Sequence, residues 1–221
     1  MCGRFTLTSD MDILLYRFAV GMPADFNYLP RYNIAPTQPV LGVVYENEQK
    51  TLKNFRWGLI PSWAKDMKFG SKMINARSET LSEKPSFKHL VKRQRCLIPA
   101  DGFYEWIQTS IPKQPVYIRL KSNEPFAFAG LWDQWQSPAE TIYSCTIITT
   151  AANSLIQSVH HRMPVILTPK QEEIWLNPEI QQYSELAPLF QPYPSDAMEM
   201  FPVSLLVNSP RNDSPECIQP I

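Results

Sequence analysis

Several features are scarce or missing in this 221-residue sequence, and each absence excludes a class of protein. No run of about 18 apolar residues occurs, so no transmembrane helix is expected. The N-terminus has no basic region followed by an apolar run, which excludes a typical secretory signal and favours a cytoplasmic location. Basic and acidic residues balance at 21 each, so any site for a polyanion must be a local group of arginines.

Glycine is also rare, with 7 residues against 21 prolines, and this ratio favours strand edges and fixed loops over a helical bundle. The four cysteines lie far apart, without a CxxC pair or a neighbouring histidine. This spacing predicts reduced thiols and no zinc site. We therefore expect a protein that uses neither a metal nor a cofactor.

What is present is a series of short runs with strand-like alternation. The predicted strands cover residues 3–7, 31–36, 40–45, 51–59, 95–100, 102–107, 116–120, 126–132, 142–149 and 200–207. The predicted helices cover residues 86–93, 151–159 and 178–186, with two more beginning near residues 9 and 168. We expect one α+β domain over residues 1–221, dominated by antiparallel strands that form a curled sheet or barrel with flanking helices.

Two helix starts carry recognisable capping patterns. Ser9 followed by Asp12 fits an N-terminal cap, and the residues after it supply an apolar helical face. Thr168 is followed by Pro169 at the first helical position and by Gln171, the pattern of a capping box.

Cys2 offers chemistry that no internal cysteine can perform. If Met1 is removed, Cys2 carries a free α-amine and a thiol, which ordinarily titrate near pH 8 and 8.5. Such a 1,2-aminothiol condenses with an aldehyde to an imine, and the thiol then closes a five-membered thiazolidine. The alternative is that Cys2 is only a small buried residue next to the start of the chain.

Six short motifs follow each other in order along the chain. They are MCGRF (residues 1–5), RYNIAP (31–36), WGLIP (57–61), INARSET (74–80), CLIPADGFYEW (96–106) and HHRMP (160–164). Together they resemble the SOS-response-associated peptidase family, the abasic-site processing proteins, and the resemblance extends into the C-terminal tail.

The resemblance implies a DNA repair protein that reacts once. It would bind an abasic site in single-stranded DNA and trap the aldehyde as a stable thiazolidine on Cys2, with single-strand to double-strand junctions as a further candidate substrate. The family name implies autocatalytic removal of Met1, and slow strand scission (lyase activity) through the imine is also implied. A monomer is expected.

Two polar residues would assist Cys2. The attacking amine must be neutral and must lose protons, which calls for a nearby carboxylate, and Glu105 is the family candidate. Its sequence position also fits an outward residue between the aromatic Tyr104 and Trp106. Asn75 can donate and accept hydrogen bonds, so it would position the thiol and amine or the sugar; as a turn or cap residue it would have no such role.

The abasic sugar exists mainly as a closed hemiacetal, so its ring must be opened by a general acid. His160 and His161 both suit this role by their ordinary pKa, and the resemblance favours His160. Surface exposure without a catalytic role is the alternative.

The expected DNA contacts fall into two groups. Arg4, Arg77 and Arg162 each lie within two residues of a catalytic candidate and would gather positive charge there despite the zero net charge. The resemblance adds Asn33, Pro36, Trp63 and Thr149. Trp63 would stack against bases or wedge at a junction, or else pack in the core. Family members can carry a second tryptophan after it, and Ala64 stands there in this chain.

Two other functions remain open at this stage. In a cysteine hydrolase, Cys2 and His160 would form a thiolate pair that cuts other peptides. A plain single-strand DNA-binding module would bind without any crosslink and would tolerate Cys2→Ala.

Overall fold

Five strands of the computed structural model close into a barrel by pairing in the ring order β3, β4, β10, β9, β6 and back to β3. The barrel strands are β3 (Pro39–Glu46), β4 (Gln49–Trp57), β6 (Arg95–Ala100), β9 (Phe126–Gln136) and β10 (Thr141–Ala151). The structure describes residues 2–22, 27–107 and 111–221, so the predictions that concern Met1 lie outside it. Alternating apolar residues of the strands fill the barrel, which explains its closure around one core.

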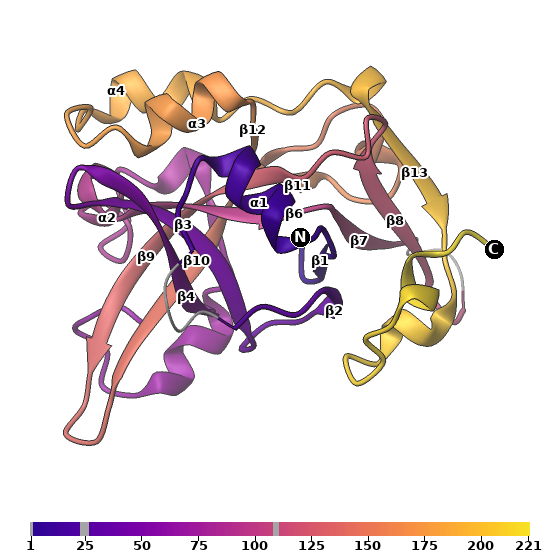
Figure 1. Cartoon of the computed structure of the whole chain (residues 1–221), viewed down its shortest axis with the longest axis horizontal. Coiled ribbons are helices and arrows are strands. Elements are labelled where there is room, and N and C mark those ends of the chain that lie inside the picture. Colours follow the sequence, from indigo (N-terminus) through magenta and orange to yellow (C-terminus); the bar gives the residue numbers. More distant parts are fainter. Residues whose placement is uncertain (1, 23–26, 108–110) are drawn as a thin grey trace.

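A second, open sheet lies against the barrel and receives the start of the chain (Figure 1). Its strand order is β13 (Met198–Pro202), β8 (Gln114–Leu120), β7 (Gly102–Ile107), β1 (Phe5–Leu7) and β2 (Arg31–Ile34), and its pairings are antiparallel. Since β1 pairs on both edges, the residues next to Cys2 are held in a sheet interior. The prediction of an α+β fold with mostly antiparallel strands and a barrel is confirmed; two pairings of β10 are parallel.

Short elements extend the barrel strands and carry several candidate residues. β5 (Asn75–Arg77) and β11 (Arg162–Pro164) both pair with β10, and β12 (Ile166–Leu167) pairs with β9. The 3-10 helices are η1 (Met67–Lys72), η2 (Ser78–Thr80), η3 (Ile156–Ser158), η4 (Ala187–Leu189), η5 (Ser195–Ala197), η6 (Leu205–Asn208) and η7 (Pro215–Ile218). β10 is therefore the strand that aligns residues 75–77 with residues 162–164.

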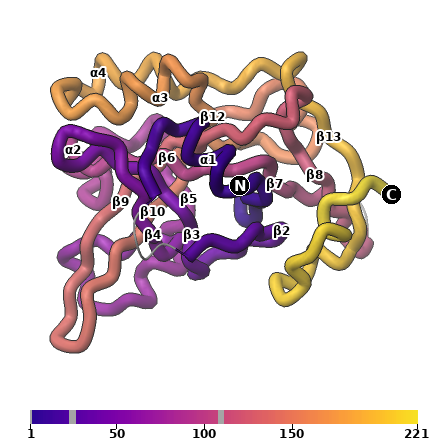
Figure 2. The backbone as a smooth tube through the Cα atoms, viewed as in Figure 1, coloured from indigo at the N-terminus to yellow at the C-terminus, as the bar shows by residue number. Residues whose placement is uncertain are grey.

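The α-helices are short and peripheral. They are α1 (Met11–Phe18), α2 (Leu90–Arg93), α3 (Pro169–Leu176) and α4 (Tyr183–Leu186). Figure 2 shows α3 and α4 along one side of the barrel and the C-terminal segment beside β8. Within the described residues, no helix is long and apolar enough to span a membrane.

The C-terminal segment, residues 203–221, forms a second small core against the open sheet. Val203, Val207 and Cys217 pack with Tyr104 of β7 and Tyr117 of β8. Because Tyr104 precedes Glu105, this packing fixes the strand that carries the candidate acid.

Several predicted elements match the structure and others need correction. The strands at residues 95–100 and 102–107 and the capping box at Thr168 are confirmed. The helix predicted at 86–93 is regular only over Leu90–Arg93, and the strand predicted at 200–207 spans Met198–Pro202 before η6 begins.

The helix predicted at residues 151–159 is wrong. The chain has only the 3-10 turn Ile156–Ser158 there, because β10 continues to Ala151 and the Asn153 side chain accepts from the backbone of Ile156 (3.0 Å). Ser9 does not cap α1 either. Its hydroxyl donates to Asp101 (2.6 Å), and Asp10 occupies the cap position without a side-chain bond.

Candidate active site and nucleic-acid interface

Cys2 lies directly before β1, and its side chain is fully buried. Phe5 pairs with Phe103, and the backbone N–H of Tyr104 donates to the carbonyl of Arg4 (3.0 Å), so β7 follows the chain back toward Cys2. Burial and, as a smaller effect, the charge of a nearby carboxylate raise the pKa of the Cys2 thiol well above its ordinary range. The thiol is therefore protonated at neutral pH in this environment.

That carboxylate is Glu105 of β7. Continuing the antiparallel register of β7 with β1 puts Glu105 opposite Gly3 and next to Cys2. Its side chain is 4% exposed, so the alternative of an outward-facing residue is wrong. Burial raises the pKa of Glu105 because it disfavours the ionised form. A carboxyl group in this state can take up and release protons closer to neutral pH than an exposed one.

Asn75 is the first residue of β5 and reaches the start of the chain through a hydrogen bond. Its side-chain Nδ2 donates to the carbonyl oxygen of Cys2 (2.8 Å). Its Oδ1 is buried and accepts no hydrogen bond from the described residues. Asn75 thus fixes the Cys2 backbone and keeps one acceptor free for a hydroxyl or amine beside it.

His160 follows η3 and precedes β11. Its Nδ1 lies 2.9 Å from the backbone nitrogen and 3.2 Å from the carbonyl oxygen of Arg162. We assign the shorter contact as the Arg162 N–H donating to Nδ1, so that the proton of the neutral ring is on Nε2. Its ring stacks on His161 at 4.4 Å between centroids and 22° between planes. Burial is the largest cause that lowers the pKa of His160, so the neutral form is favoured at pH 7. β11, which begins two residues after His160, and β5, which begins at Asn75, both pair with β10.

The buried residues Arg162 and Thr149 are bonded to each other, and Arg162 also pairs with Glu79, whose side chain is exposed. Glu79 binds Arg162 through both oxygens (2.6 and 3.0 Å), and Arg162 Nη2 also donates to the Thr149 carbonyl (2.6 Å). This hydrogen bonding lowers the pKa of Glu79. Thr149 is fully buried, so it acts here by holding Arg162 and offers no surface for DNA.

Arg4 and Asn33 likewise form an internal pair. Arg4 Nη1 donates to Asn33 Oδ1 and to the Val207 carbonyl, each at 2.7 Å. Asn33 is fully buried, and its Nδ2 donates to three carbonyls of the C-terminal segment, those of Val207, Ser209 and Asn212. Asn33 therefore positions Arg4 and the C-terminal segment in this structure, and its side chain offers no surface for DNA.

The remaining predicted DNA contacts lie at the surface. Arg77 is exposed at the end of β5, and Pro36 is half-buried in the turn after β2. Trp63 is 57% exposed and meets Phe69 edge to face at 5.4 Å between ring centroids. The alternative prediction that Trp63 packs in the core is therefore wrong.

Hydrogen bonds connect Cys2 with Asn75, Arg4 with Asn33, and Arg162 with Thr149. Glu105 acts on Cys2 through its charge. Glu79 is the residue that the sequence did not single out. Its signal was present, because Glu79 belongs to the INARSET motif two residues after Arg77. Nowhere in the described ranges do three His, Cys, Asp or Glu side chains gather as a metal site would require.

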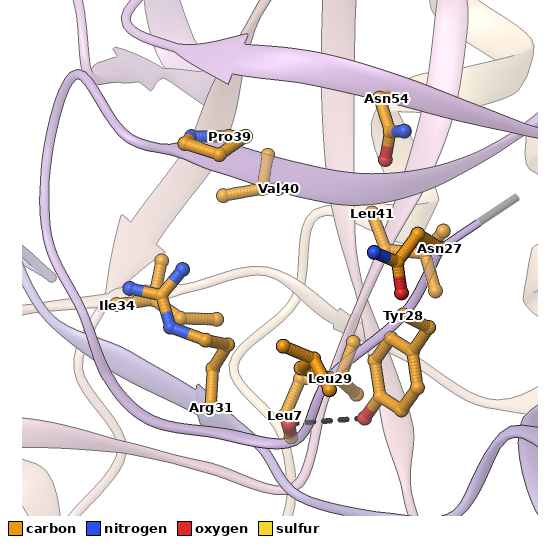
Figure 3. Close-up of a pocket in the computed structure, with 10 residues that line it drawn as sticks. All are labelled: Leu7, Asn27, Tyr28, Leu29, Arg31, Ile34, Pro39, Val40, Leu41 and Asn54. Carbon is orange, nitrogen blue, oxygen red and sulfur yellow. Dashed lines mark hydrogen bonds between the residues drawn. The ribbon is translucent and has the colours of Figure 1, made fainter. Parts of the chain in front are cut away.

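A separate hollow of about 200 Å³ lies between β1, β2 and β3 (Figure 3). Leu7, Ile34 and Val40 form part of its apolar wall, and the hydroxyl of Tyr28 donates to the Leu7 carbonyl at its edge (3.0 Å). No catalytic candidate lines this hollow. A different hollow of about 340 Å³ is lined by both Asn75 and Arg77, so the candidate site opens to solvent there.

Known proteins resemble this chain over most or all of its length. The sequence model of the SOS response associated peptidase (SRAP) family matches residues 1–210. The chain is 51% identical over 224 residues to the abasic site processing protein YoqW of Bacillus subtilis (strain 168), covering 99% of each. It is 36% identical over 227 residues to the abasic site processing protein HMCES of Gallus gallus, covering 88% of this chain and 67% of that protein. A crystal structure of a Bacteroides thetaiotaomicron protein matches with a TM-score of 0.87 at 27% identity, covering 100% of both chains.

Proposed function

The chain belongs to the SOS response associated peptidase family, and on that basis we propose that it captures abasic sites in single-stranded DNA covalently through Cys2. Single-strand to double-strand junctions are a further substrate. The observation that carries the proposal is the grouping at residue 2: a buried thiol, a carboxyl group beside it and an amide bonded to its carbonyl. The protein acts in the cytoplasm as one domain and as a monomer.

Capture begins once Met1 is removed and the α-amine of Cys2 is free. The neutral amine attacks the aldehyde carbon of the opened sugar, and loss of one water gives an imine. The Cys2 sulfur then bonds to the same carbon while its proton passes to the nitrogen, which closes the thiazolidine. The raised thiol pKa supports this order, because a protonated thiol leaves the amine as the first nucleophile.

Glu105 moves the protons in this sequence. As a carboxylate it accepts the proton that the attacking amine loses, and as a carboxylic acid it protonates the departing hydroxyl. Its raised pKa supports both roles because the two forms are closer in free energy near neutral pH. The same group assists autocatalytic removal of Met1, in which water cleaves the bond before Cys2.

His160 opens the closed sugar. With its Nδ1 accepting from the Arg162 N–H, its Nε2–H protonates the hemiacetal ring oxygen as the ring carbon–oxygen bond breaks, and the anomeric hydroxyl gives its proton back to the same nitrogen, which leaves the aldehyde. The free acceptor of Asn75 binds a hydroxyl of the same sugar. The imine acidifies the neighbouring carbon, so slow strand scission by elimination of the phosphate accompanies capture.

The alternative of a cysteine hydrolase acting on other peptides is less well supported. That chemistry uses a thiolate held beside a protonated histidine. Here the thiol pKa is raised and the pKa of His160 is lowered, so both groups favour their neutral forms.

The test is intact mass spectrometry of protein beginning at Cys2 after mixing with a single-stranded oligonucleotide that carries one abasic site. We expect a heat-stable adduct at the summed mass minus one water. Cys2→Ser keeps the amine and loses the thiol, so it should give an adduct only after borohydride reduction. A heat-stable adduct on Cys2→Ser without borohydride would contradict ring formation through the thiol. Binding of the wild type without any adduct would indicate a DNA-binding module.

A further inference from the structure

The exposed positive charge near the candidate site is concentrated in residues 65–93. This segment carries eight basic residues and three acidic ones, whereas the whole chain has 21 of each. The basic residues are Lys65, Lys68, Lys72, Arg77, Lys84, Lys88, Lys92 and Arg93, and all eight side chains are exposed. A chain with zero net charge thus has a strongly basic surface beside the hollow at Asn75.

Three of these lysines form a stripe, which we define as Lys84, Lys88 and Lys92. They recur every fourth residue, and the backbone N–H of Lys88 donates to the Lys84 carbonyl (3.0 Å), the bond of a helical turn. Residues four apart on such turns share one face. Between these lysines, Phe87, Leu90 and Val91 are buried in the main core. The three lysine side chains are therefore exposed on a segment that buried neighbours hold against the core.

The stripe begins at the candidate site. Lys84 lines the same hollow of about 340 Å³ as Asn75 and Arg77, together with Lys72. Lys88 and Lys92 line a separate hollow of about 260 Å³. Each of the two hollows is therefore lined by at least two lysines, and the first also contains Asn75 and Arg77.

The acidic residues of the segment do not neutralise the stripe. Glu79 is engaged with Arg162, and Asp66 accepts from the backbone of Lys68. Glu83 is exposed beside Lys84. Among the described residues, none of the ion pairs includes a lysine of the stripe. Its charge is therefore available to a polyanion.

We propose that the lysine stripe binds the phosphate backbone of the DNA strand that flanks the abasic nucleotide on one side. This rests on the proposed function, because it takes Asn75 and Arg77 as the position of the lesion. Phosphate contacts add affinity without reading sequence, and they set which part of a strand reaches the reactive residue. Capture should therefore require several nucleotides on the stripe side of the lesion and fewer on the other.

The first experiment measures binding of single strands with a tetrahydrofuran lesion, which lacks the aldehyde, between 50 and 200 mM salt. The triple variant Lys84→Gln, Lys88→Gln, Lys92→Gln is compared with a matched control, Lys113→Gln, Lys121→Gln, Lys170→Gln, which removes three exposed lysines elsewhere. Each phosphate contact contributes about 0.7 to the salt slope. We expect the slope of log affinity against log salt concentration to be smaller by about 2 in the stripe variant than in the wild type. Between 50 and 200 mM salt, the wild type should therefore lose about 20 times more affinity than the variant loses. An unchanged slope would overturn the proposal.

The second experiment measures the crosslinking rate with true abasic strands whose lesion lies two nucleotides from the 5′ end, two from the 3′ end, or in the middle. The stripe variant should crosslink more slowly than the wild type on the strand with a central lesion. The difference in rate should disappear on one of the two end-lesion strands, because that strand lacks the nucleotides that the stripe binds in the wild type. An equal reduction of the rate on all three strands would refute binding of the stripe to one side of the lesion. If the wild type formed no adduct while its salt slope still exceeded that of the variant, the stripe would stand and covalent capture would fail.

Discussion

Replacing Glu105 by glutamine should slow the reaction and stabilise the fold at the same time. Glutamine keeps the shape of the side chain and removes its ionisation. Proton transfer by a positioned side chain typically contributes 10²–10⁴-fold, so we expect the crosslinking rate to fall by roughly that factor. Binding to a tetrahydrofuran lesion should change little, since Glu105 is 4% exposed and lies beside the reacting atoms.

The effect on stability has a definite sign. Burial raises the pKa of Glu105 in the folded protein, whereas in the unfolded chain a glutamate titrates near 4.3. Below that value both states hold the neutral group and the wild type has no penalty. As the pH rises toward the raised folded pKa, the unfolded state ionises more easily and the wild type loses stability. The free energy of unfolding of Glu105→Gln relative to wild type should therefore be larger at pH 7 than at pH 4.

Both properties are measured on proteins released from a cleavable N-terminal fusion, so that each begins at Cys2. Single-turnover crosslinking gives the rate, and urea unfolding at pH 4 and pH 7 gives the free energies. A variant that crosslinks at the wild-type rate would refute proton transfer by Glu105. The second quantity is the free energy of unfolding of the variant minus that of the wild type. If this difference were smaller at pH 7 than at pH 4, the raised pKa of Glu105 would be refuted.

Three further outcomes are expected. His160→Ala should slow capture of the closed sugar roughly 10²-fold and leave capture of a simple open-chain aldehyde unchanged; equal slowing of both would contradict ring opening. Protein that retains Met1 should bind abasic strands yet give no heat-stable adduct by intact mass, since its Cys2 nitrogen is an amide. Asn33→Ala should lower the free energy of unfolding by about 1–3 kcal/mol in urea melts, because Arg4 and buried carbonyls lose the hydrogen bonds that Asn33 makes with them. An unchanged free energy of unfolding would contradict these hydrogen bonds.

The elements that the sequence predicted well are those whose local pattern decides the structure. The alternation in residues 95–100 and 102–107 predicted both strands with their observed ends. Thr168 and Gln171 predicted a helix start because a capping box involves only neighbouring residues. The helix predicted at 151–159 failed because pairing with β11 extends β10 to Ala151, and that partner lies farther along the chain.

The candidate site shows the same division. The motifs identified Cys2, Asn75 and Glu105, but only the fold shows that Asn75 bonds the Cys2 carbonyl across 73 residues. The sequence could not show that Asn33 and Thr149 are buried, because Asn33 donates to the Asn212 carbonyl and Thr149 to the Ala76 carbonyl, both in distant segments. For the same reason, the sequence could not show that Asn33 holds Arg4 and that Thr149 holds Arg162.

The bond between Arg4 and the Val207 carbonyl joins residues 203 positions apart, and this has a consequence for synthesis on the ribosome. The reactive end of the chain emerges first. At a synthesis rate of about 5–20 residues per second, its partner segment follows roughly 10–40 seconds later. The arginine beside Cys2 therefore obtains its final partners only when translation has passed residue 207. A ribosome that stalls before that point displays the Cys2 segment without the C-terminal contacts that hold Arg4.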